Sequence, residues 1–380
     1  MSFSPRELQR YQRHLSLAGF GVEAQQKLKR SSVLVIGAGG LGCPALLYLA
    51  AAGVGRIVII DDDRVDISNL QRQVLYTEAD AGQLKVEAAA RRLRALNPSI
   101  NIEPRAERFI RANALDLVRS VDVVIDGSDN FPTRYLVNDA CVLAGRPFVY
   151  GAIQGFEGQL SVFNWSGGPT YRCLFPEPPA AGAVPNCAEA GVLGVLPGLI
   201  GAAQACEAIK LLTGIGESLS GRLFLWDALM MTTHSVALTV DPRSRDICEL
   251  PPEGYGETCL PSIALAKEGI LRSSIEEIDV SRLLDRLGYG QKQQFIDVRQ
   301  SWERSMHGVI EPSVHLPLDE LEKGAVHSLT QLDPSMPTVV YCASGVRSLR
   351  GAQLLRERHG FHHAVSLRGG FKAWHARHSR

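Results

Sequence analysis

The sequence has no excess of charge of either sign and no long uninterrupted hydrophobic run. Its 40 lysine and arginine residues balance 40 aspartate and glutamate residues, so we expect no general attraction to nucleic acid or to an acidic membrane. The polar start, 1–7, has no basic segment followed by an apolar core, which argues against a secretory signal. The most apolar stretch, 190–203, is broken by glycines and Pro197 and is too short to span a bilayer, so it predicts a buried core helix.

The eight cysteines are scattered along the chain. Together with the lack of a secretory signal, this predicts a cytoplasmic, reducing location, in which cysteines are reactive, metal-binding or buried rather than paired in disulfides. Cys43, Cys141 and Cys206 lie on apolar faces of expected helices. We expect these three to be small core residues.

Apolar strands alternate with longer helical segments between about Ser31 and Gly151, which predicts a parallel α/β sheet. The expected strands are Val33–Ile36, Ile57–Ile60 and Val121–Ile125. A more antiparallel region follows, around the long apolar helix. The fold class that this pattern predicts is α/β.

The chain is expected to contain two domains, 1–250 and 274–380, joined by a polar linker rich in turn residues over 251–273. The spacing of Ser274 and Glu277 predicts a capping box at the start of the first helix of the second domain.

A glycine-rich turn follows the first expected strand and opens a helix. Such a turn directs backbone N–H groups at phosphate oxygens, and Asp61, at the end of the next strand, could hold a ribose hydroxyl. On these features alone the default is a dinucleotide-binding NAD-dependent oxidoreductase. The glycines concerned are Gly37, Gly39, Gly40 and Gly42.

The residues that follow Asp61 favour a triphosphate instead. Asn69, Arg72 and Lys85 come next along the chain and offer the cations that a triphosphate needs, and Asp129 follows an expected strand, where it could hold magnesium. Taken singly, the two cations are more simply solvated surface charges and Asp129 a helix cap. The whole ordered set favours the nucleotide site.

A cysteine loop lies near the C-terminus. Cys342-Ala343-Ser344-Gly345-Val346-Arg347-Ser348 follows the apolar strand 338–341. The N–H groups of such a tight loop, with an arginine beside them, stabilise a thiolate and cradle an anion. An inert buried cysteine is the simpler alternative, which the intact spacing disfavours.

The first domain resembles the HesA/MoeB/ThiF family, on Gly-x-Gly-Gly-x-Gly, 68–73, Lys85 and Ser128-Asp129-Asn130. The resemblance implies a Rossmann-like, ubiquitin-activating-type domain with a mixed sheet, which uses ATP and Mg²⁺ to adenylate the C-terminal glycine of a small ubiquitin-like sulfur carrier ending in Gly-Gly. It also implies a homodimer, because Arg13 matches an arginine that reaches into the partner subunit's site. The nucleotide would be held by Gly37, Gly39, Gly40, Gly42, Asp61, Asn69, Arg72, Lys85, Asp129 and Asn130, with Asp129 positioning magnesium.

The second domain resembles a single small α/β rhodanese domain, on the cysteine loop, 297–299, 307–317 and 369–374. The resemblance implies a persulfide on Cys342, loaded by an upstream donor such as a cysteine desulfurase. Arg347 would add positive charge to the loop, whereas Asp297 and Arg299 are expected to be structural. Attack of the persulfide on the carrier adenylate would then give a thiocarboxylate.

Two further points concern other cysteines. Cys187 lies on a loop before a helix, and is expected to form either a thioester with the carrier or a disulfide that releases the product; a helix cap without covalent role is its alternative. Many members of the family bind zinc through two Cys-x-x-Cys pairs, of which this sequence retains Cys173 and Cys248. Two thiolates do not complete a tetrahedral site, so we predict no structural zinc and expect Cys173 and Cys248 to lie near each other.

The hypothesis is therefore an enzyme that is both an adenylyltransferase and a sulfurtransferase. Two alternatives stay open at this point: an NAD-binding oxidoreductase with an appended module, and a non-catalytic scaffold that binds a carrier and a sulfur donor.

Overall fold

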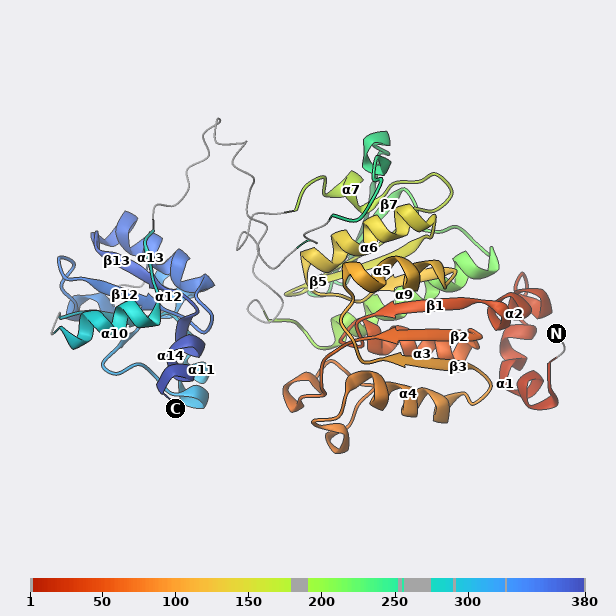
Figure 1. Cartoon of the computed structure of the whole chain (residues 1–380), viewed down its shortest axis with the longest axis horizontal. Helices are drawn as coiled ribbons and strands as arrows, with labels where there is room; N and C mark the ends of the chain where they lie inside the picture. Colours follow the sequence, from red (N-terminus) through yellow and green to blue (C-terminus); the bar gives the residue numbers. More distant parts are fainter. Residues whose placement is uncertain are drawn as a thin grey trace. The chain divides into compact units, whose positions relative to one another are not determined.

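The computed structural model of the chain describes residues 3–178, 191–251, 255, 275–289, 292–324 and 327–378. It divides into two compact units, Met1–Pro261 and Ser262–Arg380, which Figure 1 colours from red to green and from green to blue. Each unit is described by itself below.

The larger unit is built on one eight-stranded sheet with the order β3-β2-β1-β4-β5-β6-β7-β8. Neighbouring strands from β3 to β5 are parallel, and those from β5 to β8 are antiparallel, so the predicted mixed sheet is confirmed. The strands are β1 (Ser32–Ile36), β2 (Arg56–Ile60), β3 (Asn101–Arg105), β4 (Val123–Asp126), β5 (Phe148–Gln154), β6 (Glu157–Phe163), β7 (Arg222–Asp227) and β8 (Thr232–Ala237).

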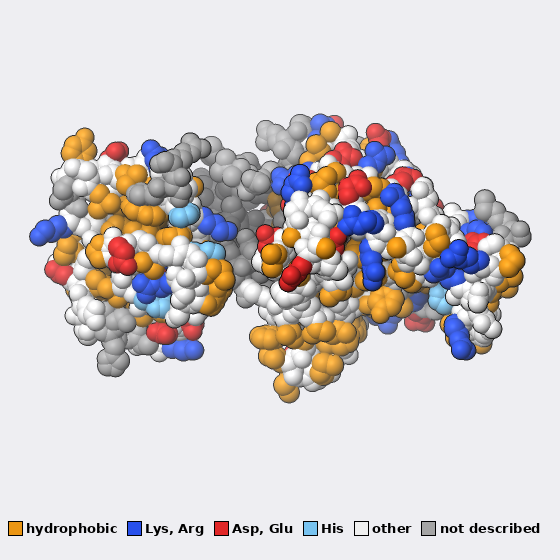
Figure 2. Space-filling model, turned by 90° about the horizontal axis from the view of Figure 1, so that it is seen from below, with side chains coloured by type: hydrophobic (Ala, Val, Ile, Leu, Met, Phe, Trp, Pro, Cys, Tyr) orange, Lys and Arg blue, Asp and Glu red, His pale blue; other side chains and the backbone are white. Residues whose placement is uncertain are grey.

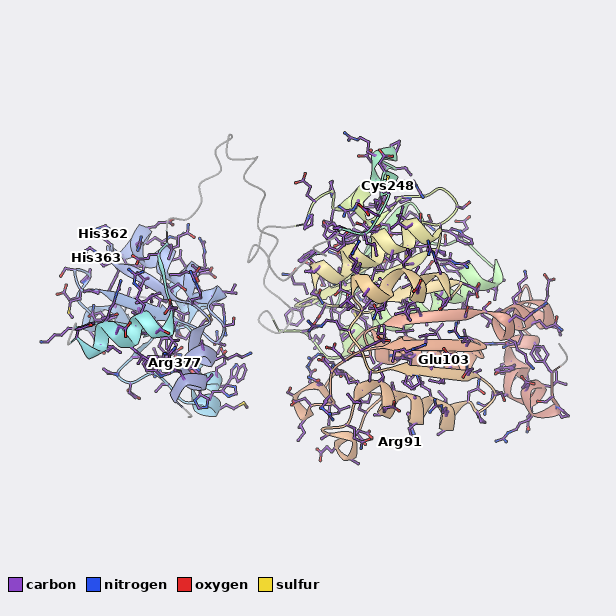
Figure 3. The ribbon with its side chains drawn as sticks, in the orientation of Figure 1. Arg91, Glu103, Cys248, His362, His363 and Arg377 are labelled. Atoms are coloured by element: carbon purple, nitrogen blue, oxygen red, sulfur yellow. The ribbon has the colours of Figure 1, made fainter. Side chains whose placement is uncertain are left out.

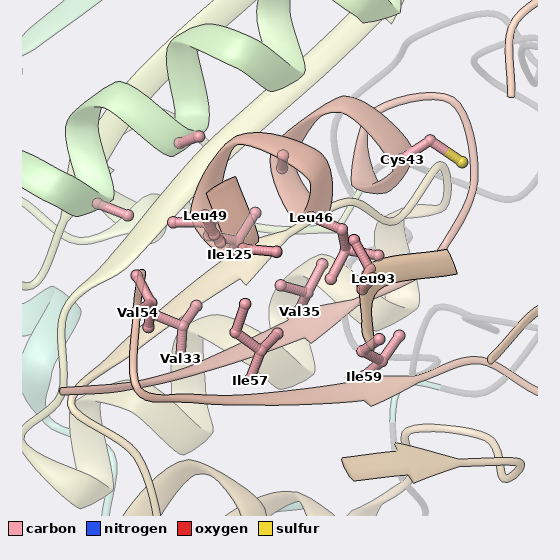
Figure 4. Close-up of a cluster of buried hydrophobic side chains, with 14 of the residues drawn as sticks. Val33, Val35, Cys43, Leu46, Leu49, Val54, Ile57, Ile59, Leu93 and Ile125 are labelled. Carbon is pink, nitrogen blue, oxygen red and sulfur yellow. The ribbon is translucent and has the colours of Figure 1, made fainter. Parts of the chain in front are cut away.

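Helices cover both faces of the parallel part of the sheet (Figure 1). They are α1 (Pro5–Leu15), α2 (Gly21–Arg30), α3 (Gly42–Ala52), α4 (Lys85–Leu96), α5 (Arg111–Arg119), α6 (Phe131–Ala144), α7 (Tyr171–Leu174) and α9 (Val195–Thr213), with short 3-10 helices η1 (Ile67–Asn69), η2 (Glu78–Asp80) and η3 (Pro242–Arg245). Two hydrophobic cores result, because successive strand residues point to opposite faces. Val33 and Val35 pack on the side of α3 (Figure 4), whereas Leu34 and Ile36 pack on the side of α5 and α6.

The apolar stretch predicted as a core helix forms α9, which begins at Val195 and packs against α3 and strands β4 to β6. By length and composition alone this helix could cross a membrane, a test that core helices also pass, and half of its apolar window is buried. The expectation that Cys206 is a core residue is wrong, because its side chain is exposed. Its neighbours Ala205 and Glu207 are buried, and α9 is apolar around most of its circumference, so its sequence does not reveal the outward side.

The smaller unit is a five-stranded sheet with the order β11-β10-β12-β13-β9, in which every pair is parallel. Its strands are β9 (Glu277–Ile278), β10 (Gln294–Asp297), β11 (Val314–His315), β12 (Thr338–Tyr341) and β13 (Ala364–Leu367). Its helices are α10 (Val280–Gly288), α11 (Ser301–His307), α12 (Leu318–Glu322), α13 (Val346–His359), α14 (Gly370–His378) and the 3-10 helix η5 (His327–Gln331).

The predicted capping box at the start of this unit is wrong. Glu277 belongs to strand β9, and Ser274 lies outside the described residues. The cap of α10 is Asp279, whose Oδ1 accepts the N–H of Arg282 at 2.8 Å. The helix starts where Asp279, the residue directly after strand β9, caps it. The spacing of Ser274 and Glu277 alone does not show that Glu277 belongs to a strand.

Candidate functional site: a nucleotide pocket and a sulfur loop

The glycine loop, defined here as Gly37–Gly42, connects β1 to α3 and is folded so tightly at its two ends that no side chain fits at Gly37 or Gly42. Gly37 has a positive φ of 87°, and a Cβ there would lie 2.9 Å from the carbonyl oxygen of Gly127. A Cβ on Gly42 would overlap the carbonyl oxygen of Gly37. The loop therefore presents bare backbone at the N-terminus of α3, where an anion is favoured by unpaired N–H groups and by the helix dipole.

Asp61 joins the glycine loop to the end of β2. Its Oδ2 accepts the N–H of Ala38 and its Oδ1 accepts the N–H of Asp63, both at 2.8 Å. Burial raises the pKa of Asp61, and the nearby charge of Lys85 acts against that rise. Asp61 thus lies against the loop as predicted, with carboxylate oxygens of Asp62 and Asp63 close enough for the three to share a cation.

The two predicted cations lie close to this loop. The ammonium group of Lys85, at the start of α4, is nearly buried and pairs with Oδ2 of Asp63 at 2.7 Å. Arg72 is half-buried, donates to the carbonyl oxygen of Ser68 at 3.2 Å, and has its Cδ 3.7 Å from where a Cβ of Gly40 would be. Asn69 is half-buried in the same segment. The ordered set that the sequence singled out therefore converges on one place.

Asp129 and Asn130 follow β4, which lies next to β1. Asp129 is exposed, and Gly127, two residues before it, is the residue that approaches Gly37. The side-chain oxygen of Asn130 accepts the N–H of Thr133 at 2.9 Å and caps α6. An exposed carboxylate such as that of Asp129 could serve as a ligand of magnesium, and this role stays a prediction.

Asp126 was missed by sequence reasoning. Its side chain is completely buried, and its Oδ1 accepts both the N–H and the hydroxyl of Ser128, at 3.0 and 2.6 Å. Its Oδ2 has no hydrogen-bond partner. Burial raises the pKa of Asp126, against the charge of buried Arg134, whose guanidinium lies over the ring of Tyr150. No signal separated this carboxylate from the neighbouring Asp129.

Arg13 is exposed in the last turn of α1. The helix that carries it is anchored by Tyr11, whose hydroxyl accepts from Nδ2 of Asn97 at 2.9 Å, and by an ion pair between Glu7 and Lys29 at 2.7 Å. The fold thus presents Arg13 to the outside. Its role in a partner's site stays a prediction.

The two expected zinc remnants, Cys173 and Cys248, differ in exposure, and their nearness to each other stays a prediction. The sulfur of Cys173 accepts the N–H groups of Thr170 and Asp241, each at 3.3 Å, and lies 3.1 Å from the hydroxyl of Ser244. Although burial acts in the opposite sense, these hydrogen bonds lower the pKa of Cys173. Cys248, labelled in Figure 3, is exposed. Cys187 lies outside the described residues, so its role also stays a prediction.

Cys342 lies at the end of β12 with a completely buried, free thiol. Its sulfur accepts the N–H of Gly345 at 3.1 Å and lies 3.6 Å from the hydroxyl of Ser348. Gly345 has a φ of 105°, a value that a side chain would strain. The N-terminus of α14 closes the loop, since Phe371 donates its N–H to the carbonyl oxygen of Cys342 at 2.7 Å.

Arg347 and Glu303 connect the cysteine loop to α11. The guanidinium of Arg347 donates to both carboxylate oxygens of Glu303, at 2.8 and 2.7 Å. Asp297 and Arg299 form a second, buried pair at 2.7 Å, with the guanidinium of Arg299 4.3 Å from the ring centre of Phe371. The second pair ties the end of β10 to α14, in line with its expected structural role.

A hydrophobic surface lies near the glycine loop, because Pro197, two residues after Val195, has its Cβ 3.2 Å from where a Cβ of Gly40 would be. Three exposed segments meet there, because Ala228 donates to the carbonyl oxygen of Phe156 and Leu193 to that of Gly155. Figure 2 shows hydrophobic side chains gathering on a projection of the larger unit. We call the following exposed residues the apolar rim: Phe156, Leu193, Val195, Leu229, Met230 and Met231.

These features define an α/β nucleotide-binding unit joined to a sulfur loop, and comparison with known proteins assigns the class. The chain belongs to the ThiF family, whose signature matches residues 11–249, and it carries a rhodanese-like domain over 279–377. The chain is 44% identical over 98% of its length, and 94% of the relative's, to the "Probable adenylyltransferase/sulfurtransferase MoeZ" of Mycobacterium tuberculosis.

Two further matches cover the first domain. The sulfur carrier protein adenylyltransferase of Thermus thermophilus is 53% identical over 64% of this chain and 92% of its own. The crystal structure of E. coli MccB with ATP superimposes with a TM-score of 0.54 and 25% identity, over 61% of this chain and 72% of the other. The predicted family, the α/β class of both domains and the enzyme class are therefore confirmed.

Proposed function

We propose that this enzyme adenylates the C-terminal glycine of a small ubiquitin-like sulfur carrier and converts that glycine to a thiocarboxylate with sulfur carried on Cys342. Support for this proposal comes from the glycine loop itself, where Asp61 accepts the N–H of Ala38, Arg72 lies next to Gly40, and Lys85 pairs with nearby Asp63. A triphosphate needs these cations, and a dinucleotide does not. The relatives with sulfur-carrier and adenylyltransferase names support the same reading.

In the first step, a carboxylate oxygen of the carrier attacks the α-phosphorus of ATP, and pyrophosphate leaves. The glycine loop would hold phosphate oxygens by its N–H groups, and Arg72 and Lys85 would offset the charge that develops on pyrophosphate. Asp61 would accept from the ribose. Magnesium, held by Asp129, would screen the charge of the phosphates. Positioning and charge neutralisation by these residues supply the catalysis.

In the second step, the persulfide of Cys342 attacks the acyl carbon of the adenylate, and AMP leaves. The carrier is then joined to Cys342 through an acyl disulfide. A thiolate of Cys187 would attack the sulfur of Cys342, so that the thiocarboxylate leaves and a Cys187–Cys342 disulfide remains, which a dithiol reductant would reopen. A carrier thioester on Cys187 is the alternative course.

The partners follow from these steps. The carrier would end in Gly-Gly and would dock on the apolar rim, from which its tail can reach the glycine loop. Cys342 would be loaded by a protein persulfide, such as that of a cysteine desulfurase. We propose a cytoplasmic homodimer in which Arg13 enters the partner subunit's nucleotide pocket.

Carrier-dependent exchange of pyrophosphate into ATP tests the proposal, with small ubiquitin-fold proteins ending in Gly-Gly as probes. Cys342→Ala should keep this exchange and lose thiocarboxylate formation, measured by the mass of the carrier. Arg72→Ala and Lys85→Ala should abolish the exchange. Absence of exchange, with nicotinamide binding in its place, would support the oxidoreductase, and exchange that is indifferent to both substitutions would refute the roles proposed for Arg72 and Lys85.

A further inference from the structure

The loop arginine of the sulfurtransferase unit is not an open positive charge. Both terminal nitrogens of Arg347 donate to the carboxylate of Glu303, at 2.8 and 2.7 Å, and the side chain of Glu303 is only 7% exposed. Charge-assisted pairs of this bidentate kind are strong and fix the guanidinium in one orientation. The pair adds no net charge next to the sulfur loop.

Glu303 is itself held in place. Its Oε2 also accepts the N–H of Gln300 at 2.8 Å, which is the reciprocal half of the capping box at the start of α11. Burial raises the pKa of Glu303, but the hydrogen bonds from Arg347 and from Gln300 outweigh burial and keep that pKa below its usual range. The carboxylate therefore remains charged at neutral pH and keeps offsetting Arg347.

The sulfur of Cys342 is stabilised by neutral groups. The N–H of Gly345 and the hydroxyl of Ser348 contact it, at 3.1 and 3.6 Å. A small sulfur donor with two negative charges would approach a sulfur loop whose own arginine is already offset by Glu303. A donor that carries one charge or none meets a smaller barrier, because the Coulomb energy is proportional to the charge of the donor.

We propose that Glu303 is a positioning residue that determines donor specificity: by pairing with Arg347, it disfavours small doubly charged sulfur donors and favours donors of low charge, such as a protein-bound persulfide. The inference rests on the proposed sulfur-carrying function of Cys342. In the loading step the thiolate of Cys342 attacks the outer sulfur of the donor. The new S–S bond forms as the donor's own bond to that sulfur breaks, and the electron pair leaves with the donor's thiolate in the case of a protein persulfide, with sulfite in the case of thiosulfate, or with a sulfinate in the case of a thiosulfonate.

The test is single-turnover loading of the full chain by two donors, with release of sulfite from thiosulfate, a dianion, and of benzenesulfinate from benzenethiosulfonate, a monoanion. In Glu303→Gln the amide keeps the capping box and leaves Arg347 with its full charge. We expect the rate of loading by thiosulfate to rise about tenfold and that by benzenethiosulfonate about threefold. The monoanion has half the charge of the dianion, so the logarithm of its rate increase should be about half as large.

Arg347→Gln should move the ratio of the two rates in the opposite direction, and the double variant should return it to near the wild-type ratio. The matched control is Glu322→Gln, which removes the same charge from an exposed pair with Arg350 on the same unit, and should leave the ratio unchanged.

Equal changes for both donors in Glu303→Gln, or an equal response in Glu322→Gln, would overturn the inference and indicate a structural role or a general charge effect. If Cys342→Ala forms the carrier thiocarboxylate as well as the wild type does, the proposed function of Cys342 fails, and the inference fails with it. If the wild type loads from both and the ratio does not respond, the inference alone fails.

Discussion

Gly370→Ala should displace the sulfur loop while leaving the nucleotide pocket intact. Gly370 has a φ of 56°, and a Cβ there would overlap the carbonyl oxygen of Cys342 and lie 2.8 Å from Ala343 C and Ser344 N. Ordinary contact begins at 3.4 Å, so this backbone must retreat by at least about 0.6 Å, and close-packed interiors do not absorb such shifts locally. Since a misplacement of about 1 Å costs on the order of 100-fold in rate, we expect a loss of about tenfold or more in sulfur loading.

The matched control is Gly360→Ala, at the end of α13. Gly360 has a φ of 75° and nothing within 4 Å of its would-be Cβ. Both variants therefore place an alanine in the left-handed backbone region, which costs about 1–2 kcal/mol. Only Gly370→Ala adds the steric overlap with the backbone of the sulfur loop. Sulfite release from thiosulfate measures loading, thermal unfolding measures stability, and carrier-dependent pyrophosphate exchange should be normal in both. A folded Gly370→Ala that keeps half of the wild-type loading rate would refute the reasoning, as would an equal loss in Gly360→Ala.

Three further outcomes follow from buried contacts. Gly42→Ala should abolish pyrophosphate exchange, because its Cβ overlaps backbone, whereas Gly198→Ala, with open space around it, should not. Burial raises the pKa of Asp126, so the folded chain keeps this proton to higher pH than the unfolded chain. The free energy of unfolding therefore falls as pH rises from 3.8 through the folded pKa. In urea denaturation Asp126→Asn should be more stable than the wild type at pH 7 but not at pH 4, and an equal difference at both pH values would contradict this. Asp297→Asn leaves the buried charge of Arg299 without its partner and should lower the free energy of unfolding of the smaller unit by about 3–5 kcal/mol. A lower thermal midpoint would show this loss, and an unchanged midpoint would contradict a stabilising role of the pair.

The nucleotide pocket was largely predictable because its parts are local or follow one rule of sheet geometry. A tight glycine turn between a strand and a helix is specified within a few residues. Asp61 and Asp129 could be assigned to the same edge of the sheet because β2 and β4 both pair in parallel with β1, and the carboxyl ends of parallel strands lie at one edge. Lys85 could be predicted as a member of the set, although not its pairing with Asp63.

Burial and long-range pairing could not be predicted in this way. Cys206 and Glu207 are neighbours on one apolar helix, yet the cysteine is exposed and the glutamate is buried. Asp126 and Asp129 are only three residues apart, yet the side chain of Asp126 is fully buried and that of Asp129 is exposed. Which side of a helix faces outward depends on what packs against it, and no residue spacing contains that information.

The sequence by itself determined the two α/β units, the glycine loop and the sulfur loop, because each of these rests on short-range backbone geometry and on strand and helix periodicity. Only the tertiary structure decided the electrostatics of the sulfur loop. Arg347 is adjacent to the loop in sequence, but its partner Glu303 comes from a different helix. The sequence suggested an unpaired positive charge on Arg347, whereas the packing of α11 against the loop pairs this charge with the carboxylate of Glu303.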